Sequence, residues 1–405
     1  MKAIVVGAGI GGLAVGLAMK RIGWTVMVCD PGIRHVPDIT SITLWSNAMA
    51  ALRDLGVEEG VLPRSHVLRA VHIRSREGRV LARFDAKELE GKRGAMSVCI
   101  TRADLMDVLL GALGRDVVVP GMTIADLRQD DGGVTVRFES GDALRADVLI
   151  GADGPGSAIR AVVDGEGVAR YAGYNLWIGL TGYAHALLPH ELAFESWGSG
   201  LRFGAMHTSG RQVSWYVARN EQRPASQGTI PEKALLRGLF RTWHQPIGEI
   251  IGSTPVGSIF RHAVYRQVPA ARWSVGRITL AGSAAHPMTS EFGQGAGIAI
   301  EDAVELARWL DSGLDIPTAL WRYERARLPR AGRIARFTRG IGRFVQTGST
   351  MGVVTRNLIA RALPERAAVS LLRGMLKTSF GSQPLGKPLA NLTIPPGSPT
   401  PTITP

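Results

Sequence analysis

The first thirty residues alternate between apolar runs and glycine-rich turns in a pattern that predicts a strand, a helix and a second strand. Lys2–Val6 is a short, mostly apolar run rich in β-branched residues, and Leu13–Ile22 is an apolar stretch of helical length that ends at Gly23. Thr25–Cys29 is a second buried-strand pattern, and it closes on Asp30. This order is typical of the opening βαβ unit of a parallel sheet.

A different periodicity occupies the middle of the chain. Apolar and polar residues alternate with a period of two over residues 173–219, and Ala70–Arg76 and Arg79–Ala86 form a hairpin pattern. Such alternation predicts antiparallel strands with one buried face. The buried-strand pattern returns at Ile278–Gly282, where it precedes a glycine-rich loop and a helix predicted over Ala296–Ser312.

These patterns predict an α/β fold in which a Rossmann-like domain carries an inserted antiparallel sheet and is followed by a C-terminal helical region. Further helices are expected over Ser46–Leu55 and Thr101–Leu113. We expect the Rossmann-like domain to comprise residues 1–165 and 269–330, with an excursion into the sheet at about 66–99. The sheet domain is expected to comprise residues 166–268. Residues 331–405 are expected to be helical apart from an unstructured tail at 394–405.

Composition narrows the class of protein. No run of about 18 apolar residues is present, which argues against a membrane span, and the N-terminus lacks a signal-peptide pattern. The two cysteines, Cys29 and Cys99, cannot build a disulfide framework and have no metal-ligand spacing. We therefore expect a cytoplasmic globular protein without a metal site, either a monomer or a homodimer.

The net charge of +13 is concentrated near the C-terminus, where Trp321 to Phe380 holds thirteen Lys or Arg against the acids Glu324 and Glu365. Such a segment can be a solvated basic helical face, a surface for an anionic partner, or a surface for acidic lipid. No aromatic platform or nucleic-acid motif accompanies it, so we expect no nucleic-acid partner.

The first turn carries a dinucleotide fingerprint, Gly7-x-Gly9-x-x-Gly12, between a predicted strand and a predicted helix. Gly7 permits the tight turn, Gly9 lets the backbone approach a pyrophosphate, and Gly12 lets the helix pack close to the strand. Asp30, at the end of the second strand, can accept hydrogen bonds from a ribose diol. The motif by itself is compatible with either NAD or FAD.

Two later segments carry a resemblance to a known family. One runs from Asp147 through Gly151-Ala-Asp153-Gly154 to Arg160, and the other runs from Leu280 through Gly282-Ser283 and the Gly293–Gly297 loop to Ala303. Together with the fingerprint, they resemble the group A aromatic-hydroxylase family of flavin monooxygenases, in the branch of urate hydroxylases, salicylate hydroxylases and zeaxanthin epoxidases. The resemblance covers roughly residues 1–340.

The resemblance implies FAD as the cofactor and assigns its contacts. The first turn would hold the pyrophosphate, Asp30 the adenosine ribose, and Arg102 would lie along the cofactor. Asp153 and Arg160 would belong to an element near the flavin, with a main role in fixing their own turn, and His286 would brace a loop rather than act as a base. The implied FAD-binding residues are Gly7, Gly9, Gly11, Gly12, Asp30, Arg102, Asp153, Gly282, Ser283, Gly293, Gln294, Gly295, Ala296 and Gly297.

The chain departs from the family at three positions that contact the flavin. Ser283 stands where the family has an aspartate, Ser290 where it has a proline, and Ile39-Thr40-Ser41 where it has a loop that contains glycine. A hydroxyl forms a weaker hydrogen bond than a carboxylate, so weaker FAD retention is expected. The changes at Ser290 and at residues 39–41 are expected to affect the movement of the flavin.

The resemblance implies an NAD(P)H-consuming monooxygenase in which reduced flavin and O2 form a C4a-hydroperoxide that hydroxylates or epoxidises a hydrophobic, aromatic or polycyclic small molecule. NAD(P)H would bind transiently, and no catalytic side-chain nucleophile is evident. A cyclase or isomerase that keeps FAD, and a non-enzymatic basic adaptor, are the alternatives. The substrate would lie against the inserted sheet and the flavin loop, with candidate contacts Trp177, Tyr183, Phe194, Trp197, Arg202, Trp215, Tyr216, Glu291 and Phe292.

Overall fold

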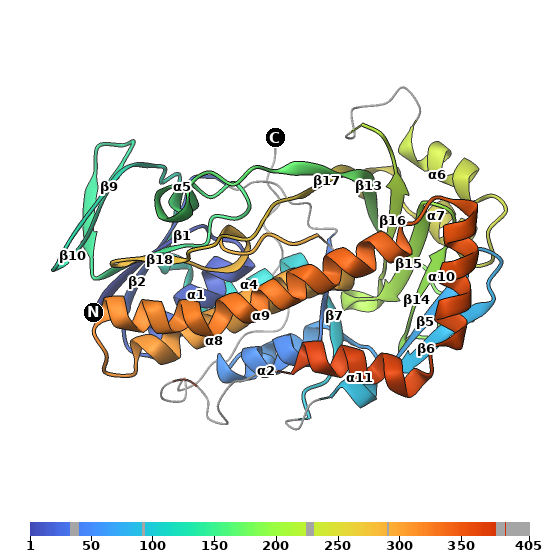
Figure 1. Ribbon diagram of the computed structural model, residues 1–405, viewed down its shortest axis with the longest axis horizontal. Helices are drawn as coiled ribbons and strands as arrows, with labels where there is room; N and C mark the ends of the chain where they lie inside the picture. The colour runs from blue at the N-terminus through green and yellow to red at the C-terminus, as the bar shows by residue number, and fades with distance from the viewer. Residues whose placement is uncertain (33–39, 91–93, 224–230, 290, 378–384, 386–405) are drawn as a thin grey trace.

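Two large sheets of different construction divide the protein, and one long helix, α9 (Ile316–Val345), runs from one to the other (Figure 1). The computed structural model describes residues 1–32, 40–90, 94–223, 231–289, 291–377 and 385. Within these residues, no helix combines the length and apolarity needed to cross a bilayer.

The first sheet is parallel except at one edge. Its central strand β1 pairs in parallel with β2 on one side and with β12 on the other. Strand β8 pairs in parallel with β2, and β19 pairs in parallel with β12. At the edge, β18 pairs antiparallel with β19. Strand residues such as Val5 and Leu149 are fully buried, as expected for a sheet covered by helices. Its order is β18 (Ser274–Val275), β19 (Ile278–Leu280), β12 (Val148–Gly151), β1 (Lys2–Val6), β2 (Thr25–Asp30) and β8 (Val118–Pro120).

The second sheet has seven strands and is antiparallel apart from one pair. Strands β5 and β14 pair in parallel, which joins the hairpin of β5 and β6 to the later strands. The sequence pattern did not anticipate this parallel pairing, because it depends on contacts between segments more than a hundred residues apart. The order is β17 (Ile259–Arg266), β13 (Arg170–Thr181), β16 (Val213–Asn220), β15 (Leu201–His207), β14 (Leu192–Trp197), β5 (Ala70–Ser75) and β6 (Val80–Asp85).

Two three-stranded sheets and the helices complete the fold. The small sheets are β11 (Ala143–Ala146), β10 (Gly133–Phe138) and β9 (Ile124–Asp130), and β3 (Ser41–Leu44), β7 (Val98–Thr101) and β4 (His66–Val67). The helices besides α9 are α1 (Ile10–Arg21), α2 (Ser46–Asp54), α3 (Glu58–Val61), α4 (Arg102–Leu113), α5 (Ala158–Asp164), α6 (Glu232–Phe240), α7 (Ile247–Ser253), α8 (Gln294–Leu310), α10 (Thr350–Ala362) and α11 (Glu365–Leu376).

The predicted α/β architecture is confirmed, with a parallel sheet, an inserted and mainly antiparallel sheet, and C-terminal helices. As predicted, Thr101 caps α4, because its hydroxyl accepts a hydrogen bond from the amide of Asp104. The expected domain division at residue 330 falls inside α9, which continues across Pro329. The tail predicted at 394–405 lies outside the described residues.

A buried ionic cluster joins α8 to α9. The guanidinium of Arg327 donates to Glu301 Oε2 at 2.8 Å and to Asp302 Oδ1 at 2.7 Å, and Arg330 donates to Glu301 Oε1 at 2.5 Å. Burial by itself raises the pKa of Glu301 and Asp302, but the positive charges around them hold the pKa of both carboxyls below their usual values. The cluster therefore keeps both carboxylates charged inside the protein.

Replacement of Arg327 by Met tests this cluster. The change removes the counter-ion that the two buried carboxylates share, and breaking a buried ion pair costs about 3–5 kcal/mol in comparable proteins, so we expect a marked fall in the thermal unfolding midpoint. Arg325→Met on the same helix, whose guanidinium lies over the exposed Trp321 ring, is the matched control and should shift the midpoint little. Equal midpoints for the two variants would contradict a structural role for the cluster.

Candidate flavin and substrate site

The first strand-to-helix turn is compact because two glycines allow close backbone contacts. Gly7 has φ +103°, and a Cβ there would lie 2.5 Å from the carbonyl oxygen of Ala152. A Cβ at Gly12 would lie 1.8 Å from the carbonyl oxygen of Gly7. A side chain at Gly7 would force this turn away from the turn after β12, and a side chain at Gly12 would force α1 away from the end of β1.

The N-terminus of α1 offers donors to an anion. Its N-cap is Gly9, which supplies no side-chain hydrogen bond to the first amides, and the nearest atom to a Cβ at Gly9 is Nη2 of Arg102 at 3.8 Å. Asp30 Oδ2 accepts from the Ala8 amide at 2.6 Å, which fixes the turn beside the end of β2. The free amides, the helix dipole and Arg102 together suit a diphosphate.

The N-terminus of α8 forms a second donor site. Its N-cap, Gly293, has a left-handed conformation and supplies no side-chain cap. Behind it, Gln294 Oε1 accepts from Asn47 Nδ2 at 3.2 Å, while Gln294 Nε2 and Asn47 Oδ1 are buried without a partner among the described residues. A Cβ at Gly295 would meet no atom within 4 Å, so the backbone there is open. Orphaned buried polar atoms beside open backbone suit a polar ring edge.

The two helix starts lie together. A Cβ at Gly11 in α1 would lie 3.4 Å from Ala299 Cβ in α8, and 4.0 Å from Cα of Gly282 in the turn after β19. Asp302 holds this turn, because its Oδ2 accepts from the Gly282 amide at 2.9 Å and is bonded to His286 Nε2. His286 therefore braces the loop.

A third turn, after β12, is stabilised by its own acid. Asp153 Oδ1 accepts from the Ser157 hydroxyl at 2.5 Å, and its Oδ2 accepts from the Ala158 amide at 2.8 Å. Burial raises the pKa of Asp153. Arg160 donates to the carbonyl of Val268 at 2.8 Å. Asp153 therefore holds its own turn in place, whereas Arg160 links α5 to the segment that follows β17.

These groups fit FAD. Residues of the α1 turn, with Asp30 and Arg102, would hold its diphosphate and ribose, and residues 293–297 with Gln294 would hold its ring. When bound, FAD supplies a ring that accepts two electrons and then activates O2. Ser283 is partly exposed in the turn that Asp302 holds, whereas Ser290 and Ile39 lie outside the described residues.

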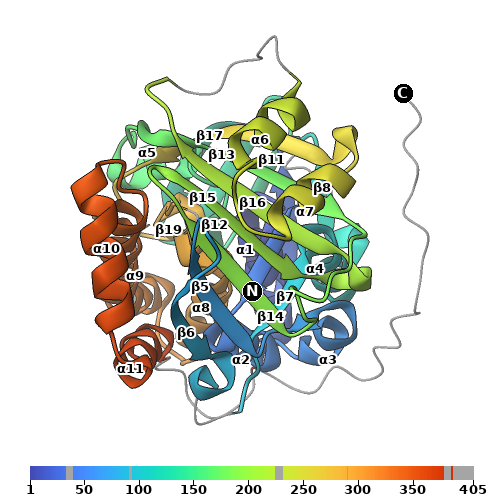
Figure 2. The same ribbon diagram turned by 90° about the vertical axis from the view of Figure 1, so that its right-hand side faces the viewer.

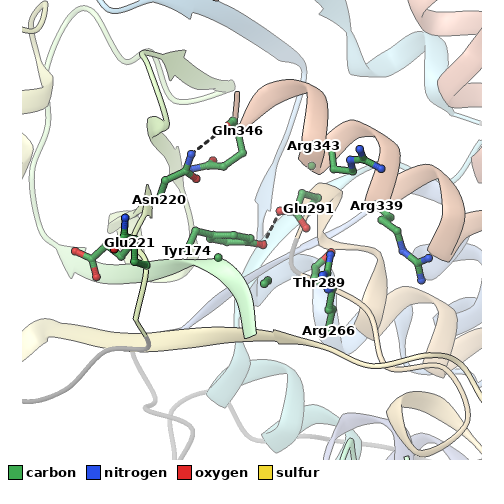
Figure 3. Close-up of a pocket in the computed structure, with 13 residues that line it drawn as sticks. Tyr174, Asn220, Glu221, Arg266, Thr289, Glu291, Arg339, Arg343 and Gln346 are labelled. Carbon is green, nitrogen blue, oxygen red and sulfur yellow. Dashed lines mark hydrogen bonds between the residues drawn. The ribbon is translucent and has the colours of Figure 1, made fainter. Parts of the chain in front are cut away.

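A pocket of about 470 Å³ lies between the second sheet, the loop before α8, and α9 (Figure 3). Tyr174 from β13 and Glu291 from the loop lie at its centre, and Gln346 follows the end of α9. Three arginines line it as well, from β17 and from α9: Arg266, Arg339 and Arg343.

A buried hydrogen-bond network forms the inner wall of this pocket. Glu291 Oε1 accepts from the Tyr174 hydroxyl at 2.6 Å and lies 3.5 Å from Arg202 Nη2. Arg202 also contacts Glu195 at 3.0 Å and Gln346 at 2.5 Å. Burial alone would lower the pKa of Arg202, but the neighbouring carboxylates raise it, so the guanidinium stays charged.

The same wall contains one unsatisfied acceptor. Glu291 Oε2 is buried and has no hydrogen-bond partner among the described residues. Burial and the adjacent carboxylate raise the pKa of Tyr174, so its hydroxyl keeps its proton and remains a donor to Glu291. The hydrogen-bonding capacity of this buried oxygen is therefore not filled by any of the described residues.

The predicted substrate contacts separate into two groups. Arg202, Tyr216 and Glu291 belong to the network, with the Tyr216 hydroxyl donating to Glu195 Oε2 at 2.5 Å. The structure does not bring the remaining sheet aromatics to the pocket. Trp177, Phe194 and Trp215 are buried on the other face of the sheet in a core with α6 and α7, and Tyr183 packs against that core and donates to Glu249.

Two further candidates have other contacts. Phe292, with φ +67°, stacks on Trp45 at a ring separation of 5.2 Å, and its carbonyl accepts from the Trp45 indole. Trp197 donates to Glu195 Oε1 at 2.7 Å and has the buried Arg356 over its ring. Sequence reasoning did not select Tyr174 or Gln346 as site residues. Gln346 gives no sequence signal beyond its position after a basic helix.

Comparisons with known proteins agree with this geometry. A family model described as an FAD binding domain matches residues 1–338. The aurachin C monooxygenase/isomerase of Stigmatella aurantiaca is 33% identical over 365 residues, covering 90% of this chain and 94% of the relative. The FAD-dependent urate hydroxylase of Klebsiella pneumoniae is 32% identical over 336 residues, covering 82% and 86%.

Solved structures match as well. The crystal structure of Klebsiella pneumoniae HpxO complexed with FAD and uric acid has a TM-score of 0.86 and 29% identity, and the match covers 93% of this chain and 96% of that one. Fold and site thus define an FAD-binding flavoenzyme. The chain belongs to the FAD binding domain family, and it is an FAD-dependent monooxygenase.

Replacement of Gly12 by Ala tests the first turn. The new methyl group would overlap the Gly7 carbonyl, so the turn must open, and overpacking of this kind costs about 1–3 kcal/mol. We expect FAD affinity to fall about 10- to 100-fold, measured from the flavin released on denaturation and by titration with FAD. Gly111→Ala, at an exposed position in α4 with no atom within 4 Å of the new Cβ, should retain its flavin.

Replacement of Ser283 by Asp tests the departure from the family. A carboxylate that accepts hydrogen bonds from the cofactor contributes about 1 kcal/mol more than a hydroxyl, so the dissociation constant for FAD should fall about fivefold. Ser283→Ala should raise it slightly. Unchanged or weaker FAD binding by the Asp variant would show that residue 283 does not contact the cofactor.

Proposed function

We propose that this monooxygenase uses NAD(P)H and O2 to hydroxylate or epoxidise a hydrophobic, aromatic or polycyclic small molecule bound in the pocket of about 470 Å³. One observation carries the proposal: the loop before α8 serves both sites. Thr289 and Glu291 line the pocket, and Gly293 and Gln294 begin the helix that would face the flavin ring. A molecule in this pocket therefore lies next to the reactive part of the cofactor.

The polar groups of the pocket favour a substrate that carries an N–H or O–H donor. Glu291 Oε2 is the unsatisfied acceptor, and a hydrogen bond from the substrate would satisfy it. Such a bond would raise the electron density of an aromatic ring and also orient it. Tyr174 and Arg202 would act as positioning residues, because each holds Glu291 from one side.

Isomerisation after oxygenation is a second candidate. The aurachin C relative, which matches along 94% of its own length, is named both a monooxygenase and an isomerase. A pocket with a buried carboxylate and a buried guanidinium can stabilise charge during a rearrangement as well as during oxygen transfer. The non-enzymatic adaptor hypothesis is not supported by these relatives.

A substrate screen tests the proposed function. The holoenzyme is mixed with NADH or NADPH and with hydrophobic aromatic compounds that carry phenol or ring N–H groups. Stimulated oxidation of the nicotinamide, together with one atom from isotopically labelled O2 in the product, is the expected result. A bound flavin that neither NADH nor NADPH reduces would contradict the choice of reductant. A product isomeric with its substrate would favour the second candidate.

Replacement of Glu291 by Gln tests the role of the free acceptor. The amide removes the charge and places a donor where the substrate needs an acceptor, so kcat/KM should fall about 10- to 100-fold while FAD content is unchanged. Glu249→Gln is the matched control, because Glu249 also accepts from a tyrosine hydroxyl but lies on the other side of the sheet. Equal activity in both variants would remove Glu291 from the proposed site.

The cytoplasmic location of the protein and its state as a monomer or homodimer remain predictions.

A further inference from the structure

Helix α10 presents a row of apolar side chains to solvent. Met351 is 81% exposed, Val354 55% and Leu358 59%. Spacings of three and four residues place them on one face of the helix. Ile359 and Leu363 are large, exposed apolar residues that adjoin this row. We call these five residues the α10 stripe.

The opposite face of α10 is firmly packed, so the stripe is a true outer surface. Arg356 is buried and donates to the carbonyls of Gly198 at 3.0 Å and Val345 at 2.9 Å. Ala360 packs in a core with Leu81 and Trp197. Figure 2 shows α10 at the outer edge of the molecule. The described residues leave the stripe uncovered, and contiguous apolar surfaces of this kind mark interaction sites.

The charges around the stripe are positive. Helix α10 contains no acidic residue, and between residues 350 and 376 the acid is Glu365. Arg361 and Arg366 are exposed at the turn from α10 to α11, and Arg339 and Arg343 are exposed near the end of α9. The ion pairs of the described residues compensate none of these four arginines. An apolar row with uncompensated arginines is complementary to anionic head groups above an acyl layer.

We propose that the α10 stripe docks this protein on the surface of a membrane that contains anionic lipid. The apolar side chains would enter the head-group boundary, and the arginines would contact the lipid phosphates. A second copy of the chain is a poorer occupant. Pairing of two copies through the stripe would place two surfaces that both carry uncompensated arginines against each other, with repulsion between like charges.

The stripe lies close to the mouth of the pocket. Arg343 and Gln346 line the pocket, and α10 begins at Thr350, only four residues after Gln346. Ser199 fixes the connection by donating to the carbonyl of Gly348 at 2.7 Å. A membrane on the stripe would therefore lie beside the pocket and could supply an apolar molecule. The docking inference itself does not depend on the proposed function.

Flotation with lipid vesicles tests the inference. The purified full-length holoenzyme is mixed with vesicles of phosphatidylcholine alone or of phosphatidylcholine with phosphatidylglycerol. We expect binding to the anionic vesicles, much weaker binding to the neutral ones, and release as the salt concentration rises, because salt screens the arginines. Absence of binding to the anionic vesicles would overturn the proposal.

Surface variants locate the contact. Met351→Ser, Val354→Ser and Leu358→Ser combined should lower the partition coefficient more than about tenfold, because three apolar side chains no longer enter the lipid. Val162→Ser, Val256→Ser and Val268→Ser combined are the matched control, since these valines are similarly exposed elsewhere. FAD content and thermal midpoint show whether both variants are folded. Equal binding by the two variants would overturn the proposal.

A charge variant keeps the test decisive if the serine variant does not fold. Arg361→Gln with Arg366→Gln changes only exposed side chains and should weaken anionic binding, by about fivefold for each arginine. Full retention of binding would overturn the proposal. Light scattering adds one more outcome: a dimer that the serine variant converts to a monomer, without vesicle binding, would overturn membrane docking in favour of self-association.

Discussion

Helices α1 and α8 approach each other near their N-terminal ends, and this approach brings the two helix starts together. A Cβ at Gly11 in α1 would lie 3.4 Å from Ala299 Cβ in α8, and the backbones come this close because Gly11 and Gly282 carry no side chain where they pass. Asp302 then fixes the Gly282 turn from inside the protein. Without this approach, the two sets of free amides could not converge on one ligand. The candidate cofactor site therefore depends on backbone proximity more than on any single functional side chain.

Buried charge gives the site its rigidity. Arg327 and Arg330 hold Glu301 and Asp302 behind α8, and Arg202 holds Glu195 and Glu291 behind the pocket. For Glu301, Asp302 and Arg202, burial opposes ionisation, and nearby opposite charges restore it. Arg202 contacts Glu291 directly, and Arg327 and Arg330 hold Glu301 further along α8. Glu291 lines the pocket, and Gln294 begins the helix that would face the flavin ring.

The structure divides the basic C-terminal segment into two kinds of arginine. Arg327, Arg330 and Arg356 are buried and bind carboxylates or backbone carbonyls, so they belong to the fold. Arg339, Arg343, Arg361 and Arg366 remain exposed beside the pocket and the α10 stripe. The net charge of the segment counts buried and exposed arginines equally. Only the exposed group can contribute to the recognition of an anionic surface.

The sequence by itself determined the features that depend on residues close together in the chain. These are the strand–helix–strand opening, the tight turn of Gly7 to Gly12 with its dinucleotide fingerprint, and the hairpin of β5 and β6. The sequence also supplied Arg202 and Glu291 as candidate substrate contacts, and the structure places Glu291 in the pocket with Arg202 beside it. It could not decide which face of the second sheet meets the cofactor, because both faces carry aromatic residues and a period of two marks them equally. Trp177 and Trp215 were therefore expected in the pocket, although they pack against α6 and α7. The parallel pairing of β5 with β14 and the contact of Gln346 with Arg202 came only from the tertiary structure, because each joins segments more than a hundred residues apart.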